Sequence, residues 1–289
     1  MYVCAFTDEV LPDVEAAIRV CLEHDVHDVQ VRNVRGTNVV HLPEDEVVRL
    51  AAAAKRAGVR VTGIGSPFGK CELNDDAVAA HLPLFERMLR VAELFETRMV
   101  RVFAFFAHER RRTDGAPLTL ADVLPEVAER LAGPVARAER EGITLGLENE
   151  YTTLAGTCAE ALAVVDAVGS PALQICWDVA SGWHTGEPVL PDGYEQVQGR
   201  ICDVHVRDAL GRPDAPTLHG VVTRLGDGAI EWEAIVRRLR ADGYGGPLSL
   251  ETHLYSRDPE RESQLKAATV HGMRALQRLL APSAVGVAG

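Results

Sequence analysis

Short apolar runs alternate with longer amphipathic segments along almost the whole chain. The apolar runs are rich in β-branched residues and lack the strict alternation of a half-exposed antiparallel strand, which predicts strands buried on both faces. Such strands are predicted at residues 2–6, 27–32, 59–64, 98–104, 143–147, 173–177, 201–206 and 247–251. Helical patterns between them cover residues 12–24, 43–57, 76–95, 120–141, 158–168, 231–241 and 259–280. The connection at 180–199 has only a weak helical pattern.

Proline and glycine positions agree with this division. Pro43 suits the first turn of a helix, and Gly58, Gly142 and Gly169 each follow a last turn just before the next strand. Strands that are each followed by a helix predict the α/β class, in the form of a single-domain (β/α)8 TIM barrel over residues 1–281. Residues 282–289 are expected to be a frayed tail.

Composition narrows the possible functions. The chain of 289 residues has 30 Lys and Arg against 42 Asp and Glu, a net charge of −12. With no run of five or more basic residues, nucleic acid is a poor partner. The sequence has no apolar run of about 20 residues, and Asp8 interrupts any signal-peptide core, so we expect a cytoplasmic protein without a membrane partner. Six singly scattered cysteines indicate reduced thiols.

Candidate chemistry lies at the ends of the last four predicted strands. The working site of a TIM barrel is at the carboxyl ends of its strands, and there the sequence places Glu148, Asp178, His205 and Glu251. Three carboxylates and an imidazole suit a divalent cation, with Mn²⁺ or Mg²⁺ favoured and Co²⁺, Zn²⁺ or Fe²⁺ possible. The alternative for each residue is an ordinary polar strand end that meets solvent.

These residues lie within motifs that resemble the xylose-isomerase-like superfamily, the sugar phosphate isomerase/epimerase family. The motifs are GSPFGK at 65–70, RVFAFF at 101–106, GITLGLEN at 142–149, WDVASGWHTGE at 177–187, DVHVRDA at 203–209, GDGAIEWEAI at 226–235 and GYGGPLSLE at 243–251. The resemblance implies that the four strand-end residues are the metal ligands. It also implies that Glu148 and Glu251 transfer protons, and that the protein is a homo-oligomer.

A divalent ion that chelates a carbonyl and its neighbouring hydroxyl acidifies the carbon-bound proton and stabilises an enediolate. Return of the proton gives epimerisation or isomerisation of a sugar, keto-sugar or cyclitol. Two alternatives stay open. One is a lyase or dehydratase that eliminates from a 3-keto-glycoside or an inosose. The other is a sugar-binding or scaffold barrel with a structural metal.

Further residues are candidates for substrate binding, each with a structural alternative. Lys70 could bind a substrate oxygen or phosphate, and Arg207 could bind substrate or pair with Asp208 or another loop acid. The remaining candidates are Trp183, His184, Glu150 and Phe105, for which packing or ligand orientation is the alternative. Ketose 3-epimerases of the superfamily carry a histidine and an arginine where this sequence has Ser181 and Gly211, so their substrate contacts do not transfer.

Overall fold

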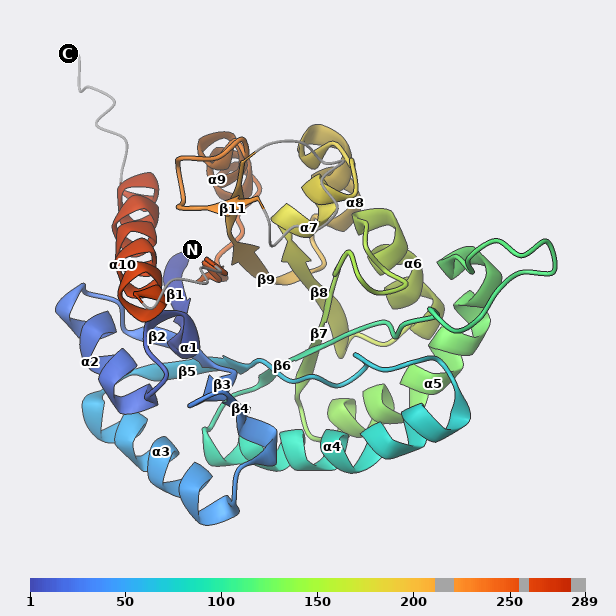
Figure 1. Ribbon diagram of the computed structural model, residues 1–289, viewed down its shortest axis with the longest axis horizontal. Coiled ribbons are helices and arrows are strands. Elements are labelled where there is room, and N and C mark those ends of the chain that lie inside the picture. Colours follow the sequence, from blue (N-terminus) through green and yellow to red (C-terminus); the bar gives the residue numbers. More distant parts are fainter. Residues whose placement is uncertain (211–220, 255–259, 282–289) are drawn as a thin grey trace.

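Parallel strands close into a barrel whose first and last strands pair with each other (Figure 1). The computed structural model describes residues 1–210, 221–254 and 260–281; the expected tail, Gly211 and the expected helix start at Pro259 lie outside this part of the chain. The barrel order is β1, β12, β9, β8, β7, β6, β5 and β2. Their bounds are Tyr2–Phe6, Pro247–Leu250, Ile201–Val206, Leu173–Asp178, Thr144–Glu148, Met99–Val102, Arg60–Ile64 and Asp28–Val31. The predicted (β/α)8 fold is confirmed.

Helices surround the barrel and bury the outer faces of the strands (Figure 1). The large helices are α2 (Val14–Glu23), α3 (Glu44–Ala57), α4 (Asp75–Leu94), α5 (Leu120–Arg140), α6 (Cys158–Val168), α9 (Trp232–Ala241) and α10 (Arg261–Leu280). In α3, for example, Val47, Leu50 and Ala54 are buried, and the helix ends at Gly58 in the left-handed conformation. Because both faces of the strands are covered, their sequences read as continuous apolar runs.

Short elements that the sequence did not predict gather after the carboxyl ends of the strands. They are α1 (Thr7–Val10), β3 (Asn33–Val34) with β4 (Thr37–Asn38), η1 (Val39–His41), and β10 (Asp208–Ala209) with β11 (Val222–Thr223). The weak pattern at 180–199 forms α7 (Val179–His184), η2 (Val189–Gly193) and α8 (Tyr194–Val197). These elements are too short for periodicity to reveal, and they build the rim of the barrel mouth. All six cysteines are free.

Candidate metal centre and active site

The four strand-end residues meet in the barrel mouth. Glu148 ends β7, Asp178 ends β8, His205 lies in β9 and Glu251 directly follows β12. Strand register brings Asp178 beside His205, and each of the four residues is at most 1% exposed. One ligand atom from each residue lies within 4.8 Å of the others. The barrel thus gathers three carboxylates and an imidazole in one dry space.

The cluster fits a divalent cation because several of its buried nitrogen and oxygen atoms make no hydrogen bond. Among the described residues, Glu148 Oε2, Glu251 Oε2 and both ring nitrogens of His205 are buried without a hydrogen bond. His205 Nδ1 lies 3.6 Å from Glu148 Oε1 and 3.4 Å from Glu251 Oε2. Buried polar atoms without partners are costly, and a cation bound between them would satisfy the two carboxylate oxygens and His205 Nδ1. A mostly oxygen donor set with one imidazole suits a hard or borderline ion.

Three arginines, two of which the sequence analysis missed, pair with the ligand carboxylates. Arg32 follows β2 and binds Glu251, whereas Arg101 in β6 has Nη1 at 3.1 Å from Glu148 Oε2. Arg207, a predicted candidate, follows β9 and binds Asp178. Its neighbour Asp208 instead accepts hydrogen bonds from backbone N–H groups of the loop at 226–230. The signal in the sequence was an arginine inside or at the end of an otherwise apolar strand.

These charges move the pKa values of the ligands apart. Burial alone raises the pKa of Glu148, but Arg101 and His205 outweigh it and hold this pKa well below its ordinary value. Burial raises the pKa of Asp178 to about 7, with the charges of Glu148 and Glu251 acting in the same direction and Arg207 opposing. Glu148 is therefore a carboxylate at neutral pH, and Asp178 gives up its proton near neutrality.

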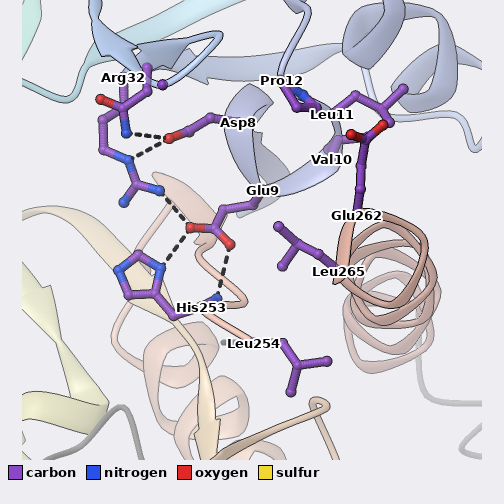
Figure 2. A pocket seen from close by; sticks show the side chains of 12 residues that line it. Asp8, Glu9, Val10, Leu11, Pro12, Arg32, His253, Leu254, Glu262 and Leu265 are labelled. Atoms are coloured by element: carbon purple, nitrogen blue, oxygen red, sulfur yellow. Dashed lines mark hydrogen bonds and ion pairs between the residues drawn. The ribbon is translucent and has the colours of Figure 1, made fainter. Parts of the chain in front are cut away.

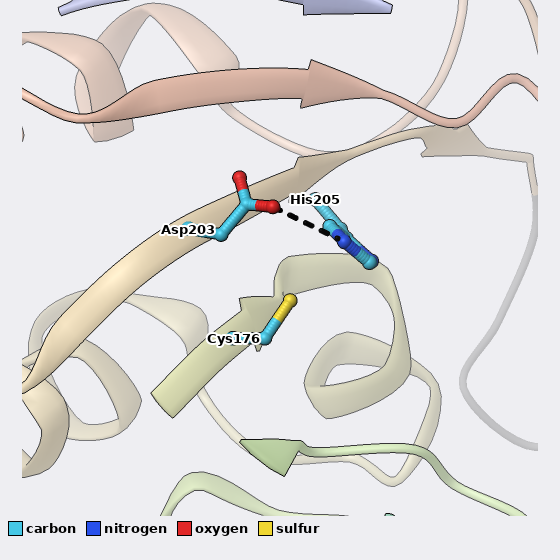
Figure 3. A group of neighbouring side chains, drawn as sticks. All are labelled: Cys176, Asp203 and His205. Carbon is cyan, nitrogen blue, oxygen red and sulfur yellow. Dashed lines mark ion pairs between the residues drawn. The ribbon is translucent and has the colours of Figure 1, made fainter. Parts of the chain in front are cut away.

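A buried group that includes Asp203 lies beside His205 (Figure 3). The Asp203 carboxylate lies 3.5 Å from His205 Nε2 and accepts hydrogen bonds from Gln30 and Ser249. With Nε2 facing Asp203, Nδ1 faces Glu148 and Glu251. Metal-binding histidines commonly have such a carboxylate behind them. The sequence analysis missed Asp203, although its spacing of two from His205 puts both on one face of β9.

Glu9, which the sequence analysis missed, pairs with His253 (Figure 2), and the two residues lie beside Glu251. Glu9 accepts hydrogen bonds from the backbone N–H of His253 (2.9 Å) and contacts its Nδ1 at 2.6 Å. The His253 Nε2 lies 3.4 Å from Glu251 Oε1, and the His253 backbone has a φ of 47°. Glu9 and His253 line a cavity of about 470 Å³, together with Leu11 and Leu265.

The remaining predicted residues fall into two places. Lys70 lies 3.4 Å from Glu150 Oε2 and 4.4 Å above the Phe103 ring, with 37% of its side chain exposed. His184 packs edge-on against Tyr151 at 4.7 Å.

Phe105 is fully buried with a φ of 63°, so its ring belongs to the core. Trp183 lines a different cavity of about 300 Å³, together with Glu187 and Ile230. The structure therefore brings Lys70 and Glu150 together and places Trp183 in a cavity of its own.

Comparison with known proteins identifies the family. The family model named xylose isomerase-like TIM barrel matches residues 18–279 of the sequence. The chain belongs to this family. An L-ribulose-5-phosphate 3-epimerase, UlaE of Salmonella typhi, is 25% identical over 219 residues, which cover 72% of this chain and 69% of UlaE.

Solved structures share the fold. The probable 3-DHS dehydratase AsbF of Bacillus anthracis has a TM-score of 0.73 at 17% identity and covers 96% of this chain and 99% of its own. The IOLI protein with a bound zinc atom has a TM-score of 0.76 at 16% identity and covers 96% and 98%. An L-ribulose 3-epimerase has a TM-score of 0.71 at 18% identity, and the match covers 97% of this chain and 95% of the epimerase.

Among the helices that the structure describes, none combines the length and the apolar composition that a membrane-spanning helix needs.

Proposed function

We propose that this member of the family is a divalent-metal-dependent isomerase or epimerase of a sugar, keto-sugar or cyclitol, which moves a proton through an enediolate. The observation that carries the proposal is the cluster of Glu148, Asp178, His205 and Glu251, in which an oxygen of each glutamate and His205 Nδ1 are buried without a hydrogen bond among the described residues. The named relatives, among them a ribulose-5-phosphate epimerase, support this reaction class.

The residues of the cluster divide the work. A divalent cation held there would polarise the carbonyl and adjacent hydroxyl of the substrate and so acidify the proton between them. Glu148 and Glu251 come from β7 and β12, with β8 and β9 between them, so they approach the mouth from two sides. One carboxylate removes the carbon-bound proton and the other returns one. Arg101 keeps Glu148 ionised and ready to accept a proton.

A lyase that eliminates water or an alcohol is the second candidate. The Glu9–His253 pair favours it, because an imidazole oriented by a carboxylate lies 3.4 Å from Glu251 Oε1. Elimination requires an acid for the leaving oxygen in addition to the base that takes the carbon-bound proton. The shared fold of AsbF, a probable 3-DHS dehydratase, also supports this candidate.

The test is proton exchange. The Mn²⁺-loaded chain is incubated in D2O with ketopentoses, ketohexoses and inososes, and deuterium at the carbon next to the carbonyl is followed by NMR. Glu251→Gln and Glu148→Gln should each slow exchange by about 10²–10⁴-fold. The exposed Glu233→Gln on α9 should exchange at the wild-type rate. Wild-type exchange by Glu251→Gln would refute its proton-transfer role, and release of water without inversion would favour the lyase.

A further inference from the structure

Three guanidinium groups converge on one carboxylate in the mouth. Arg32 binds Glu251 directly, and Arg101 Nη1 lies 3.6 Å from Glu251 Oε1. Arg207 Nη1 lies 4.0 Å from Glu251 Oε2. The side chains are 12%, 7% and 1% exposed, respectively. Three cations that approach one acid in a space with little solvent repel one another unless each has further anions.

Arg32 has such anions of its own. Its Nε–H donates to Asp8 Oδ2 at 2.9 Å, and its other terminal nitrogen binds Glu9 (Figure 2). Asp8 and Glu9 are not part of the four-residue cluster, and Glu9 is also shared with His253. Arg32 therefore keeps its charge partners whatever happens to Glu251.

Arg101 and Arg207 have no such reserve. Among the described residues, the acids within 4 Å of Arg101 are Glu148 and Glu251, and those within 4 Å of Arg207 are Asp178 and Glu251. The buried Nε–H of Arg101 lacks any hydrogen-bond partner in the same part of the chain. The Arg101 guanidinium lies against the faces of Phe103 (4.8 Å) and Phe6 (5.9 Å), which hold it in place.

A cation in the cluster would compete with these two arginines for the same carboxylate oxygens, because Glu148, Asp178 and Glu251 are also its ligands. This competition leaves N–H donors of both guanidiniums in need of another acceptor. The nearby Glu150 does not supply it, because Glu150 is paired with Lys70 at 3.4 Å. Asp203 lies behind His205 and is occupied by Gln30 and Ser249.

We infer that Arg101 and Arg207 form an anion subsite, so that the substrate carries a carboxylate or phosphate beside its reacting carbons. A guanidinium presents a planar fork of donors that matches either group. The inference rests on the proposed function, since these donors lose their carboxylate partners only when the cluster holds its cation. It adds the chemical class of the substrate, which the four ligands alone do not specify.

Binding of matched probes tests the subsite without turnover. Ribitol, ribonate and ribitol 5-phosphate are titrated into the Mn²⁺-loaded chain by isothermal calorimetry. At least one anion should bind about 10-fold or more tightly than ribitol, and the preferred anion identifies a carboxylate or a phosphate as the group recognised. Arg101→Gln and Arg207→Gln should each lose most of this preference, measured as the ratio of anion to ribitol affinity in the Mn²⁺-loaded variant. The exposed Arg237→Gln on α9 removes the same charge far from the mouth and should keep the preference.

Two results would overturn the inference. One is equal affinity of wild type for the three probes, and the other is an undiminished preference in both glutamine variants, because the metal alone would then recognise the anion. Thermal unfolding and Mn²⁺ content establish that each variant is folded and loaded. If Arg101→Gln does not fold, Arg207→Gln and the charge-retaining Arg101→Lys decide. Failure of wild type to bind Mn²⁺ would refute the proposed function itself, before any probe is added.

Discussion

At the scale of single residues, the barrel mouth contains several arginines that share a small number of buried carboxylates. The single carboxylate of Glu251 lies within 4 Å of four basic side chains, those of Arg32, Arg101, Arg207 and His205. Such an arrangement keeps the ligand carboxylates ionised while they are buried, which a cation requires of them. The consequences are measurable one residue at a time.

Proton competition at Asp178 predicts that metal affinity depends on pH. Because burial raises the pKa of this carboxyl to about 7, a proton occupies it at lower pH and must leave when a cation binds. Mn²⁺ affinity should therefore increase with pH and level off above 7, with binding at pH 6 about tenfold weaker than at pH 8. Calorimetric titrations at several pH values measure this, and an affinity that stays constant from pH 5.5 to 7.5 would contradict it.

Asp203 should act as a positioning residue for His205. Asp203→Asn removes the anion 3.5 Å behind Nε2 and should weaken Mn²⁺ binding about 10–100-fold. Cys202, one residue earlier on β9, donates its S–H to the Ile175 carbonyl, and Cys202→Ala is the matched control. If both variants bind Mn²⁺ as wild type does, the network serves packing alone.

At the scale of elements, the loop after β5 is held like an additional strand. Phe103 N–H donates to Phe68 O, Phe105 N–H to Gly69 O and Phe106 N–H to Cys71 O, at 2.8–3.0 Å. This pairing fixes Lys70 over the Phe103 ring at the mouth. Gly69 makes it possible, because its φ is 85° and a Cβ there would meet the backbone carbonyl of Phe103.

Gly69→Ala therefore should destabilise the fold more than the same change elsewhere. Gly115 has nearly the same φ, 84°, with nothing near a Cβ, so Gly115→Ala measures the backbone strain alone, about 1–2 kcal/mol. Gly69→Ala adds the clash, a further 1–3 kcal/mol in order of magnitude. Denaturant unfolding compares the two, and equal free energies of unfolding would show that the loop moves freely away from Phe103.

The barrel strands and most large helices could be predicted from the sequence, because burial on both faces leaves a plain apolar pattern. The four ligands followed from the rule that strand ends meet. Arg32, Arg101 and Glu9 could not be placed in the same way, because their direction depends on the closure and tilt of the barrel and on the four-residue helix α1. Trp183 was a substrate-binding candidate from its motif, with packing as the alternative, and from its place in α7 it lines another cavity.

At the scale of the whole molecule, the cation should join four neighbouring strands of the barrel and so stabilise the fold. The ligands come from β7, β8, β9 and the end of β12, and no such site exists in the unfolded chain. Free Mn²⁺ at 100 times its Kd should add about 2.7 kcal/mol to the free energy of unfolding, and chelation should remove this gain. Thermal unfolding with and without chelator measures it. An unchanged Tm under saturating metal would contradict a site formed only by the folded barrel.

The central claim is that four buried side chains hold one divalent ion, and electron paramagnetic resonance of Mn²⁺ added to the metal-free chain tests it most directly. In wild type and in Arg237→Gln, the free-ion signal should stay absent until one equivalent of Mn²⁺ has been added. In His205→Ala and Asp178→Asn, binding should be weaker by about 100-fold or more, because each loses a direct ligand. A free-ion signal that grows from the first addition to wild type, or equal binding by the two ligand variants, would contradict the account.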